Sequence, residues 1–285
     1  MRAATCYVCQ SCAHIESRWI GRCVKCSEWN SFIEEKADPH TPGLRGGRPM
    51  PVLLRDVEAA DIPRECSGIE PFDRVLGGGV VPGSLVLLGG DPGMGKSTLL
   101  LQVLNGLKCS SLYVSGEESA VQTAARAKRL GIKHPSLYIV SETSLENIQA
   151  SAQELQPDVM VLDSVQTLTT SALDSSAGSA SQVKEVAGRM GYFAKPRDLC
   201  VILVGHANKD NDFAGPKTLE HIVDVVLWLE GDADSPARWL KATKNRFGPT
   251  HELGEFRMGE RGMVSAKRAE QGGESQAPRA PTVKA

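Results

Sequence analysis

Residues 89 to 98, GGDPGMGKST, have the types and spacing of a phosphate-binding loop. They fit the pattern G-x-x-x-x-G-K-[ST] at Gly90, Gly95, Lys96 and Ser97, after an apolar run and before a segment of helix-forming composition. Glycines let such a loop turn successive N–H groups toward a phosphate, and the helix adds its positive N-terminal end. The pattern therefore predicts a nucleotide site.

The roles within this loop follow from its chemistry. We expect the Lys96 ammonium to reach the β- and γ-phosphate oxygens and the Ser97 hydroxyl to ligate Mg²⁺. A loop that only connects a strand to a helix is the alternative, which the combination of strand, loop, Lys-Ser pair and helix disfavours. The residues expected to surround the nucleotide are Gly90, Asp91, Pro92, Gly93, Met94, Gly95, Lys96, Ser97 and Thr98.

Acidic residues at the ends of two other apolar runs would complete a hydrolytic site. Asp163 ends DVMVLDS and could hold Mg²⁺ through water, although an Asp at a strand end is often a turn former. Glu117 follows LYVSG and is expected to orient the attacking water. Glu118 is the alternative for that role, or a solvated residue at a helix start. Together these residues predict hydrolysis of the nucleotide.

Six short apolar runs alternate with segments of helical spacing between residues 52 and 262. Strands that are apolar on both faces and separated by helix-length segments predict an α/β fold with a mainly parallel sheet covered on both sides. The expected strands are SLVLLGG, SSLYVSGE, SLYIVS, DVMVLDS, CVILVGH and VVLWLEG.

Composition divides the 285 residues into four segments. Five of the eight cysteines lie in the first 26 residues, which predicts a metal module over 1–36. Residues 37–51 are rich in Pro and Gly and read as a linker, 52–262 as the catalytic domain, and the polar residues 263–285 as a disordered tail.

The cysteines of the first segment form two C-x-x-C pairs, ten residues apart. Two such turns converge on one tetrahedral Zn²⁺, and so small a module needs the metal to fold. Redox chemistry is the competing interpretation, and Cys6 has the spacing to replace a member of the first pair. Basic and Trp residues of the module could contact DNA, form its minimal core, or dock a protein. The expected zinc ligands are Cys9, Cys12, Cys23 and Cys26.

Bulk composition narrows the class of protein. Hydrophobic residues make up 41% and charged residues 23%, and no run of eighteen apolar residues could cross a bilayer. The N-terminus has no apolar stretch resembling a secretory signal, so we expect a cytoplasmic protein with reduced thiols and no membrane contact. The net charge of −2 decides nothing about nucleic acid, because binding needs only a local positive stripe.

Across residues 9 to 262 the chain resembles the bacterial RadA (Sms) DNA-repair ATPases. The stretch AGPKTLEHIVDVVLWLEGD adds to four that carry this resemblance: YVCQSCAHIESRWIGRCVKCSEWNSF, RVLGGGVVPGSLVLLGGDPGMGKSTLLLQ, LYVSGEES and KNRFG at 244 to 248. The resemblance implies a RecA-like core, ATP hydrolysis, a hexameric ring, and translocation on single-stranded DNA that drives branch migration of recombination intermediates. It also implies branched DNA and a recombinase as partners.

The resemblance assigns roles to further residues. Lys244 and Arg246 would serve the motor by contacting DNA or ATP of the neighbouring subunit, unless they form a solvated basic hairpin. His206, after CVILVG, could sense the γ-phosphate, and Lys209 on the next loop is a weaker DNA contact. Residues 169–182 should form a mobile loop lining the channel of such a ring, or an idle surface loop.

The chain departs from the family pattern at its end. Family members continue into a Lon-protease-like domain, whereas this sequence has only a polar tail after GEFRMGERGM, so we expect that domain to be absent and the stability of the ring to be in doubt. An ATP-dependent regulatory switch of the KaiC-like kind, with the zinc module docking a protein, is therefore the alternative function.

Overall fold

A computed structural model describes residues 5–9, 15–16, 18–24, 27–30, 32–36, 53–56, 62–206, 219–232 and 235–266. The chain divides into two compact units, residues 1–60 and 61–285, and each is described by itself. The predicted linker, residues 37–51, and residues 267–285 of the predicted tail lie outside the described residues. No helix in the described parts of the chain is long and apolar enough to cross a membrane.

The first unit contains a small antiparallel sheet. Strand β1 (Thr5–Cys9) pairs with β2 (Ile15–Glu16) on one side and with β3 (Phe32–Lys36) on the other. Cys23 and Phe32 are buried, with Tyr7 and Ile20 packed against them. These four side chains form the hydrophobic cluster among the described residues of this unit.

The second unit is built on a nine-stranded sheet with the order β12-β11-β10-β9-β4-β8-β7-β5-β6. Six neighbouring strands are parallel. Their bounds are β4 (Leu85–Gly89), β5 (Ser111–Ser115), β6 (Leu137–Ser141), β7 (Val159–Asp163), β8 (Cys200–Val204) and β9 (Val225–Gly231). All six correspond to the apolar runs of the sequence, and the predicted α/β architecture is confirmed.

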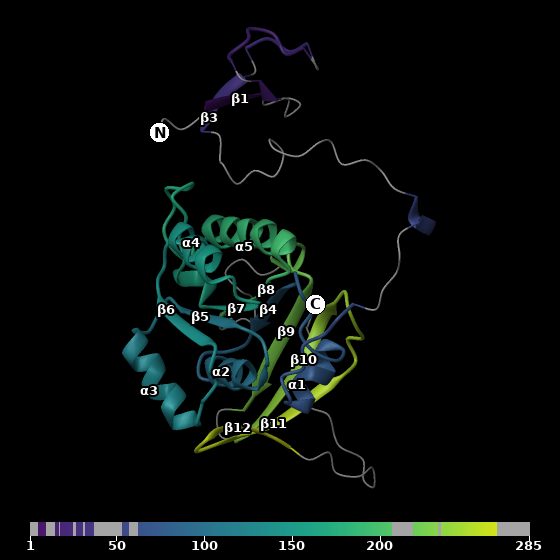
Figure 1. The fold of residues 1–285 in the computed structure, drawn as a ribbon, viewed down its shortest axis with the longest axis vertical. Helices are drawn as coiled ribbons and strands as arrows, with labels where there is room; N and C mark the ends of the chain where they lie inside the picture. The colour runs from purple at the N-terminus through teal and green to yellow at the C-terminus, as the bar shows by residue number, and fades with distance from the viewer. Residues whose placement is uncertain are drawn as a thin grey trace, which may run out of the picture. The chain divides into compact units, whose positions relative to one another are not determined.

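Helices cover both faces of this sheet (Figure 1). Helices α1 (Glu70–Leu76) and α2 (Lys96–Gly106) pack on one face, over side chains such as Val86 and Leu88. Helices α4 (Leu145–Leu155) and α5 (Ala180–Ala194) pack on the other, over Leu85 and Leu87. Alternate residues of β4 thus enter two separate cores, because successive side chains of a strand point to opposite faces.

Three antiparallel strands extend the sheet beyond the expected parallel part. They are β10 (Ala237–Asn245), β11 (Leu253–Gly259) and β12 (Gly262–Ser265). The predicted end of the domain at residue 262 is wrong: β12 pairs with β11, and Met263 is buried in the core. The polar composition of the tail hides one short strand, which is held by its pairing with β11.

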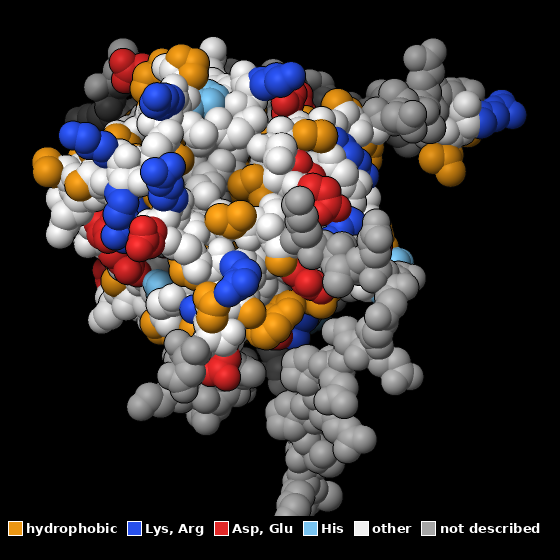
Figure 2. Space-filling model, turned by 90° about the horizontal axis from the view of Figure 1, so that it is seen from below, with side chains coloured by type: hydrophobic (Ala, Val, Ile, Leu, Met, Phe, Trp, Pro, Cys, Tyr) orange, Lys and Arg blue, Asp and Glu red, His pale blue; other side chains and the backbone are white. Residues whose placement is uncertain are grey.

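The other margin of the sheet also differs from the expectation. β6 was predicted to be buried on both faces, but it is the edge strand, with Tyr138 and Ile139 exposed. A groove of about 410 Å³ lies between β6 and α3 (Ala120–Leu130), with the Tyr113 ring in its lining. On the face shown in Figure 2, Lys and Arg side chains gather over the left side. The last turn of α3 carries Lys128 and Arg129. Composition could not reveal β6 as an edge, because edge position depends on strand order.

Candidate active site

The phosphate-binding loop joins the carboxyl end of β4 to α2. Gly90, Gly93 and Gly95 adopt φ angles of 147°, 82° and 97°, which side chains rarely tolerate. A Cβ at Gly90 would also lie 2.3 Å from the carbonyl oxygen of Leu229. Gly95 is the N-cap of α2 and makes no side-chain capping bond, so the first N–H groups of the helix are not capped by that residue. They are suited to bind an anion.

Lys96 is buried inside this loop. Its Nζ donates to the carbonyl oxygens of Gly90 at 2.7 Å and Asp91 at 2.9 Å. Burial lowers the pKa of Lys96, and the charges of Asp163, Asp91 and Glu117 only partly oppose that effect. Burial therefore makes the charged form of Lys96 less favourable than it is in water. Phosphate oxygens would be stronger hydrogen-bond acceptors for this ammonium than the two carbonyl oxygens.

Asp163 ends β7 and meets a residue that the sequence analysis did not identify. Its Oδ2 accepts a hydrogen bond from the hydroxyl of Tyr113 on β5. The pKa of this phenol is raised, by burial first and by Asp163 second, while a hydrogen bond with Ser97 acts in the opposite direction. Tyr113 thus links Ser97 and Asp163, the two residues expected to hold Mg²⁺. A hydroxyl and a carboxylate are oxygen donors, which suit this hard cation.

Glu117 and Glu118 follow β5 but have different partners. Glu117 Oε1 accepts from Ser164 Oγ at 2.5 Å and from His206 Nε2 at 3.0 Å. Burial alone would raise the pKa of Glu117, but these two hydrogen bonds and the charges of His206 and Lys96 lower it. Glu118 instead forms an ion pair with Arg126. The geometry thus distinguishes Glu117, an ionised carboxylate near Lys96, from its neighbour.

These residues come from four adjacent strands of the sheet. The order β4-β8-β7-β5 brings the loop, His206, Asp163 and Glu117 together at the carboxyl ends of the parallel strands, because each follows or ends one of these strands. This side of the sheet is called its carboxyl edge. The backbone oxygen of His206 also accepts from Gln166 Nε2 at 3.3 Å. Lys209 lies outside the described residues.

Lys244 and Arg246 lie at the amino edge of the sheet, beside the start of β4. Lys244 Nζ donates to the carbonyl oxygens of Glu220 and Val223, and burial, with the charge of Arg246, lowers the pKa of Lys244. Arg246 pairs with the buried Asp224, whose other oxygen accepts from the N–H at the start of β4. The phosphate-binding loop follows the far end of β4, so neither basic residue lies beside that loop in this chain.

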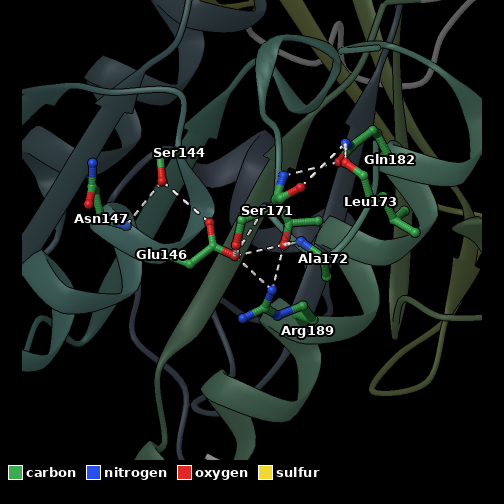
Figure 3. A network of polar contacts seen from close by, with 9 residues as sticks. Ser144, Glu146, Asn147, Ser171, Ala172, Leu173, Gln182 and Arg189 are labelled. Carbon is green, nitrogen blue, oxygen red and sulfur yellow. Dashed lines mark hydrogen bonds and ion pairs between the residues drawn. The ribbon is translucent and has the colours of Figure 1, made fainter. Parts of the chain in front are cut away.

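Residues 169–182, which are expected to form a mobile loop, are linked by several hydrogen bonds to helices α4 and α5 (Figure 3). Gln182, almost fully buried, accepts from the N–H of Thr170 and donates to the carbonyl oxygens of Leu173 and Ser175. Residues from 180 onward already belong to α5. The small polar residues of this segment show no periodicity that would predict its conformation. The buried side-chain amide of Gln182 holds the turn through these hydrogen bonds.

A further set of hydrogen bonds to this loop forms a clamp that centres on Glu146 of α4 (Figure 3). Glu146 Oε1 accepts from Thr170 Oγ1 at 2.7 Å and Arg189 Nη1 at 2.8 Å, and it also receives the Ser171 hydroxyl. Burial raises the pKa of Glu146, but the hydrogen bonds and the Arg189 charge outweigh it and lower the pKa to about 2. The clamp joins α4, the loop and α5.

Replacing this carboxylate gives a prediction with a defined pH dependence. Because the folded pKa lies below the ordinary value of 4.5, the stabilisation is present above about pH 4.5 and is lost as the pH falls toward 2. Glu146→Gln should lower the free energy of unfolding at pH 7 by about 1 kcal/mol, a figure reduced for partial exposure. Urea unfolding between pH 7 and 3 should show this difference shrinking below pH 4.5. Glu154→Gln, on an exposed position of α4, is the control; a difference independent of pH would contradict the assignment.

The metal module is described only in part. Cys23 is buried, its N–H donates to the Glu28 carbonyl oxygen and its carbonyl oxygen accepts from Ser27 N–H at 2.9 Å. The Arg22 guanidinium lies 5.6 Å from the centre of the Trp29 ring. Cys12, Cys26 and the side chain of Cys9 lie outside the described residues, and among those described no metal-binding cluster of three His, Cys, Asp or Glu residues occurs. The tight turn after Cys23 is compatible with a metal knuckle.

Comparison with known families decides what kind of protein carries this site. Residues 49–212 match the family described as AAA domain. The chain belongs to the AAA domain family. Residues 7–34 match a second family, described as a rubredoxin metal-binding domain, which confirms the predicted metal module in the first unit. The AAA domain match thus covers the part of the chain that contains the phosphate-binding loop, and the metal-binding match precedes it in the sequence.

Individual relatives confirm the resemblance to RadA. The chain is 45% identical over 270 residues to the DNA repair protein RadA of Bacillus subtilis, and 46% identical over 269 residues to that of Escherichia coli. Each match covers 90% of this chain, but the chain spans only 58% of the length of each relative. The fold is shared with a KaiC-like protein of Pyrococcus horikoshii, with a TM-score of 0.59 at 22% identity, covering 72% of this chain and all of that one.

Proposed function

We propose that the chain hydrolyses ATP with Mg²⁺ as part of DNA repair and recombination, and that DNA stimulates this hydrolysis. The observation that carries the proposal is the meeting of Lys96, Ser97, Asp163 and Glu117 at one edge of the sheet. The similarity to RadA proteins supports the connection with DNA repair. Single-stranded and branched DNA are the proposed substrates of the motor, which translocates to drive branch migration.

The chain's own residues divide the chemistry between them. The loop N–H groups and Lys96 bind the triphosphate and stabilise charge that develops on the γ-phosphate. Ser97 and Asp163 would hold Mg²⁺, which supplies further positive charge to the phosphates. Glu117 accepts a hydrogen bond from the attacking water and orients it. His206, which is hydrogen-bonded to Glu117, is proposed to respond to the γ-phosphate.

Lys244 and Arg246 are proposed to act on a neighbouring subunit or on DNA. Their position at the amino edge of the sheet is far along β4 from the loop that holds ATP in the same subunit. Arg246 is half-exposed, so its guanidinium can exchange Asp224 for a phosphate oxygen. A homo-oligomeric ring, a hexamer in this proposal, would present this edge to the next subunit. Lys209 remains a proposed DNA contact.

The metal module is proposed to bind Zn²⁺ through Cys9, Cys12, Cys23 and Cys26. The match to a metal-binding family over residues 7–34 and the C-x-x-C spacing support this ligand set. Its proposed partners are DNA or a recombinase. Chelation should unfold the module and leave the second unit folded, because the second unit has its own core.

ATP turnover with and without single-stranded DNA tests the function. We expect DNA to raise kcat several-fold and to shift the mass measured by light scattering toward a ring when ATP is present. Slow turnover that is indifferent to DNA would instead support the KaiC-like regulatory switch. A protein that stays monomeric with ATP and DNA would exclude the ring.

A further inference from the structure

Ser164 is a buried serine whose hydroxyl is used outside its own turn. It directly follows Asp163 and occupies the N-cap position of the short 3-10 helix η2 (Val165–Thr167), yet its side chain makes no capping bond. Capping is the ordinary use of a serine at such a position. Here the hydroxyl donates to Glu117 Oε1 at 2.5 Å instead. A general structural role therefore does not account for this side chain.

The backbones that carry Ser164 and Glu117 are fixed to each other. The N–H of Gly116 donates to the carbonyl oxygen of Asp163 at 2.7 Å, and the Thr167 hydroxyl donates to the Ser164 carbonyl oxygen at 2.8 Å. A Cβ at Gly116 would lie 2.0 Å from Thr167 Oγ1, so a residue with a side chain would push η2 away. Donor and acceptor thus sit on supports that hold their separation.

His206 supplies a second hydrogen bond to the same carboxylate oxygen. Its Nε2 lies 3.0 Å from Glu117 Oε1, and its backbone is tied to η2 through Gln166. Among the described residues, both hydrogen bonds to the Glu117 carboxylate reach Oε1, and Oε2 receives none. The terminal torsion of a glutamate is soft, so two donors on one oxygen are needed to fix the plane of the carboxylate.

We propose that Ser164 is a positioning residue for ATP hydrolysis: it holds Glu117 Oε1, together with His206, so that Oε2 faces the attacking water. The inference rests on the proposed hydrolytic role of Glu117. Orientation of the group that activates water contributes to the rate of the chemical step and not to nucleotide affinity. Loss of Ser164 should therefore act on kcat while leaving KM unchanged.

The test compares three variants in the full chain. Ser164→Ala should lower kcat about ten-fold, the loss of one hydrogen bond to a charged group, with KM for ATP and the thermal midpoint unchanged. Ser164→Thr, which keeps the hydroxyl, should recover most of the activity. Ser84→Ala is the matched control, since Ser84 is a buried serine whose hydroxyl bonds Val81 and Cys200 at the other end of β4. It should leave kcat unchanged.

A double-variant comparison separates positioning from a merely structural role. In a Glu117→Gln background, Ser164→Ala should have no further effect on the residual kcat, because the carboxylate it positions is gone. An additional ten-fold loss there, or a wild-type kcat in Ser164→Ala, would overturn the inference. Full activity of Glu117→Gln would overturn both the proposed hydrolytic role of Glu117 and this inference, whereas a wild-type chain that does not hydrolyse ATP would contradict the proposed function itself.

Discussion

Glu117→Gln should lower kcat for ATP hydrolysis by about 100- to 10,000-fold, the usual contribution of a positioned base. The amide keeps the size of the side chain but cannot accept a proton from water. Nucleotide binding should persist, because Lys96 and the loop N–H groups are untouched. Phosphate release under steady-state conditions, with ATP affinity measured by calorimetry, checks both expectations.

Glu118→Gln is the matched control for this variant. The Glu118 carboxylate pairs with Arg126, 24% exposed at its side chain, and should contribute to local stability and not to the chemical step. Its kcat should stay within about two-fold of the wild type, since a partly exposed ion pair contributes at most about 1 kcal/mol to folding. A large loss in Glu118→Gln with a small one in Glu117→Gln would reverse the assignment of the two carboxylates.

Lys96→Met should abolish productive nucleotide binding and lower kcat at least about 100-fold. In the wild type, MgATP at 100 times its Kd should add about 2.7 kcal/mol to the free energy of unfolding, and the variant should gain much less. Without nucleotide, the variant should be as stable as the wild type to within about 1 kcal/mol, because a buried ammonium is removed along with its two carbonyl contacts. Denaturant unfolding with and without nucleotide measures the stabilisation by MgATP and the stability of the free protein, and phosphate release measures kcat.

Lys108→Met provides the comparison at the other end of α2. Lys108 is exposed and follows the helix, so its loss should alter neither the nucleotide-dependent stabilisation nor kcat. If Lys96→Met retains the stabilisation by MgATP, the loop does not bind the triphosphate through this amine.

The residues of the candidate nucleotide site could be predicted from the sequence because each belongs to a short local pattern. Each strand is apolar and short, and each functional residue directly follows or ends one, so parallel strands must bring them to a common edge. The loop glycines are likewise local, since their φ angles follow from the turn between β4 and α2. These inferences need the direction of the strands but not the order in which they pair.

Residues that act through distant partners could not be found in this way. Tyr113 and Ser164 lie 50 residues from Asp163 and 47 residues from Glu117, their respective partners. Lys244 was expected to reach phosphate, but its ammonium is held by carbonyl oxygens of 220 and 223, more than twenty residues away in sequence. The fixed loop after Leu168 depends on Gln182 and Glu146, from two different helices.

The sequence by itself determined an α/β core with a phosphate-binding loop and a metal-binding module, because glycine spacing, paired cysteines and apolar runs each act over a few residues. Only the tertiary structure decided which oxygen of Glu117 is held, which strand forms the edge, and where the basic residues of KNRFG point. These features depend on strand order and on hydrogen bonds between segments far apart in the chain, and no local pattern encodes such distances.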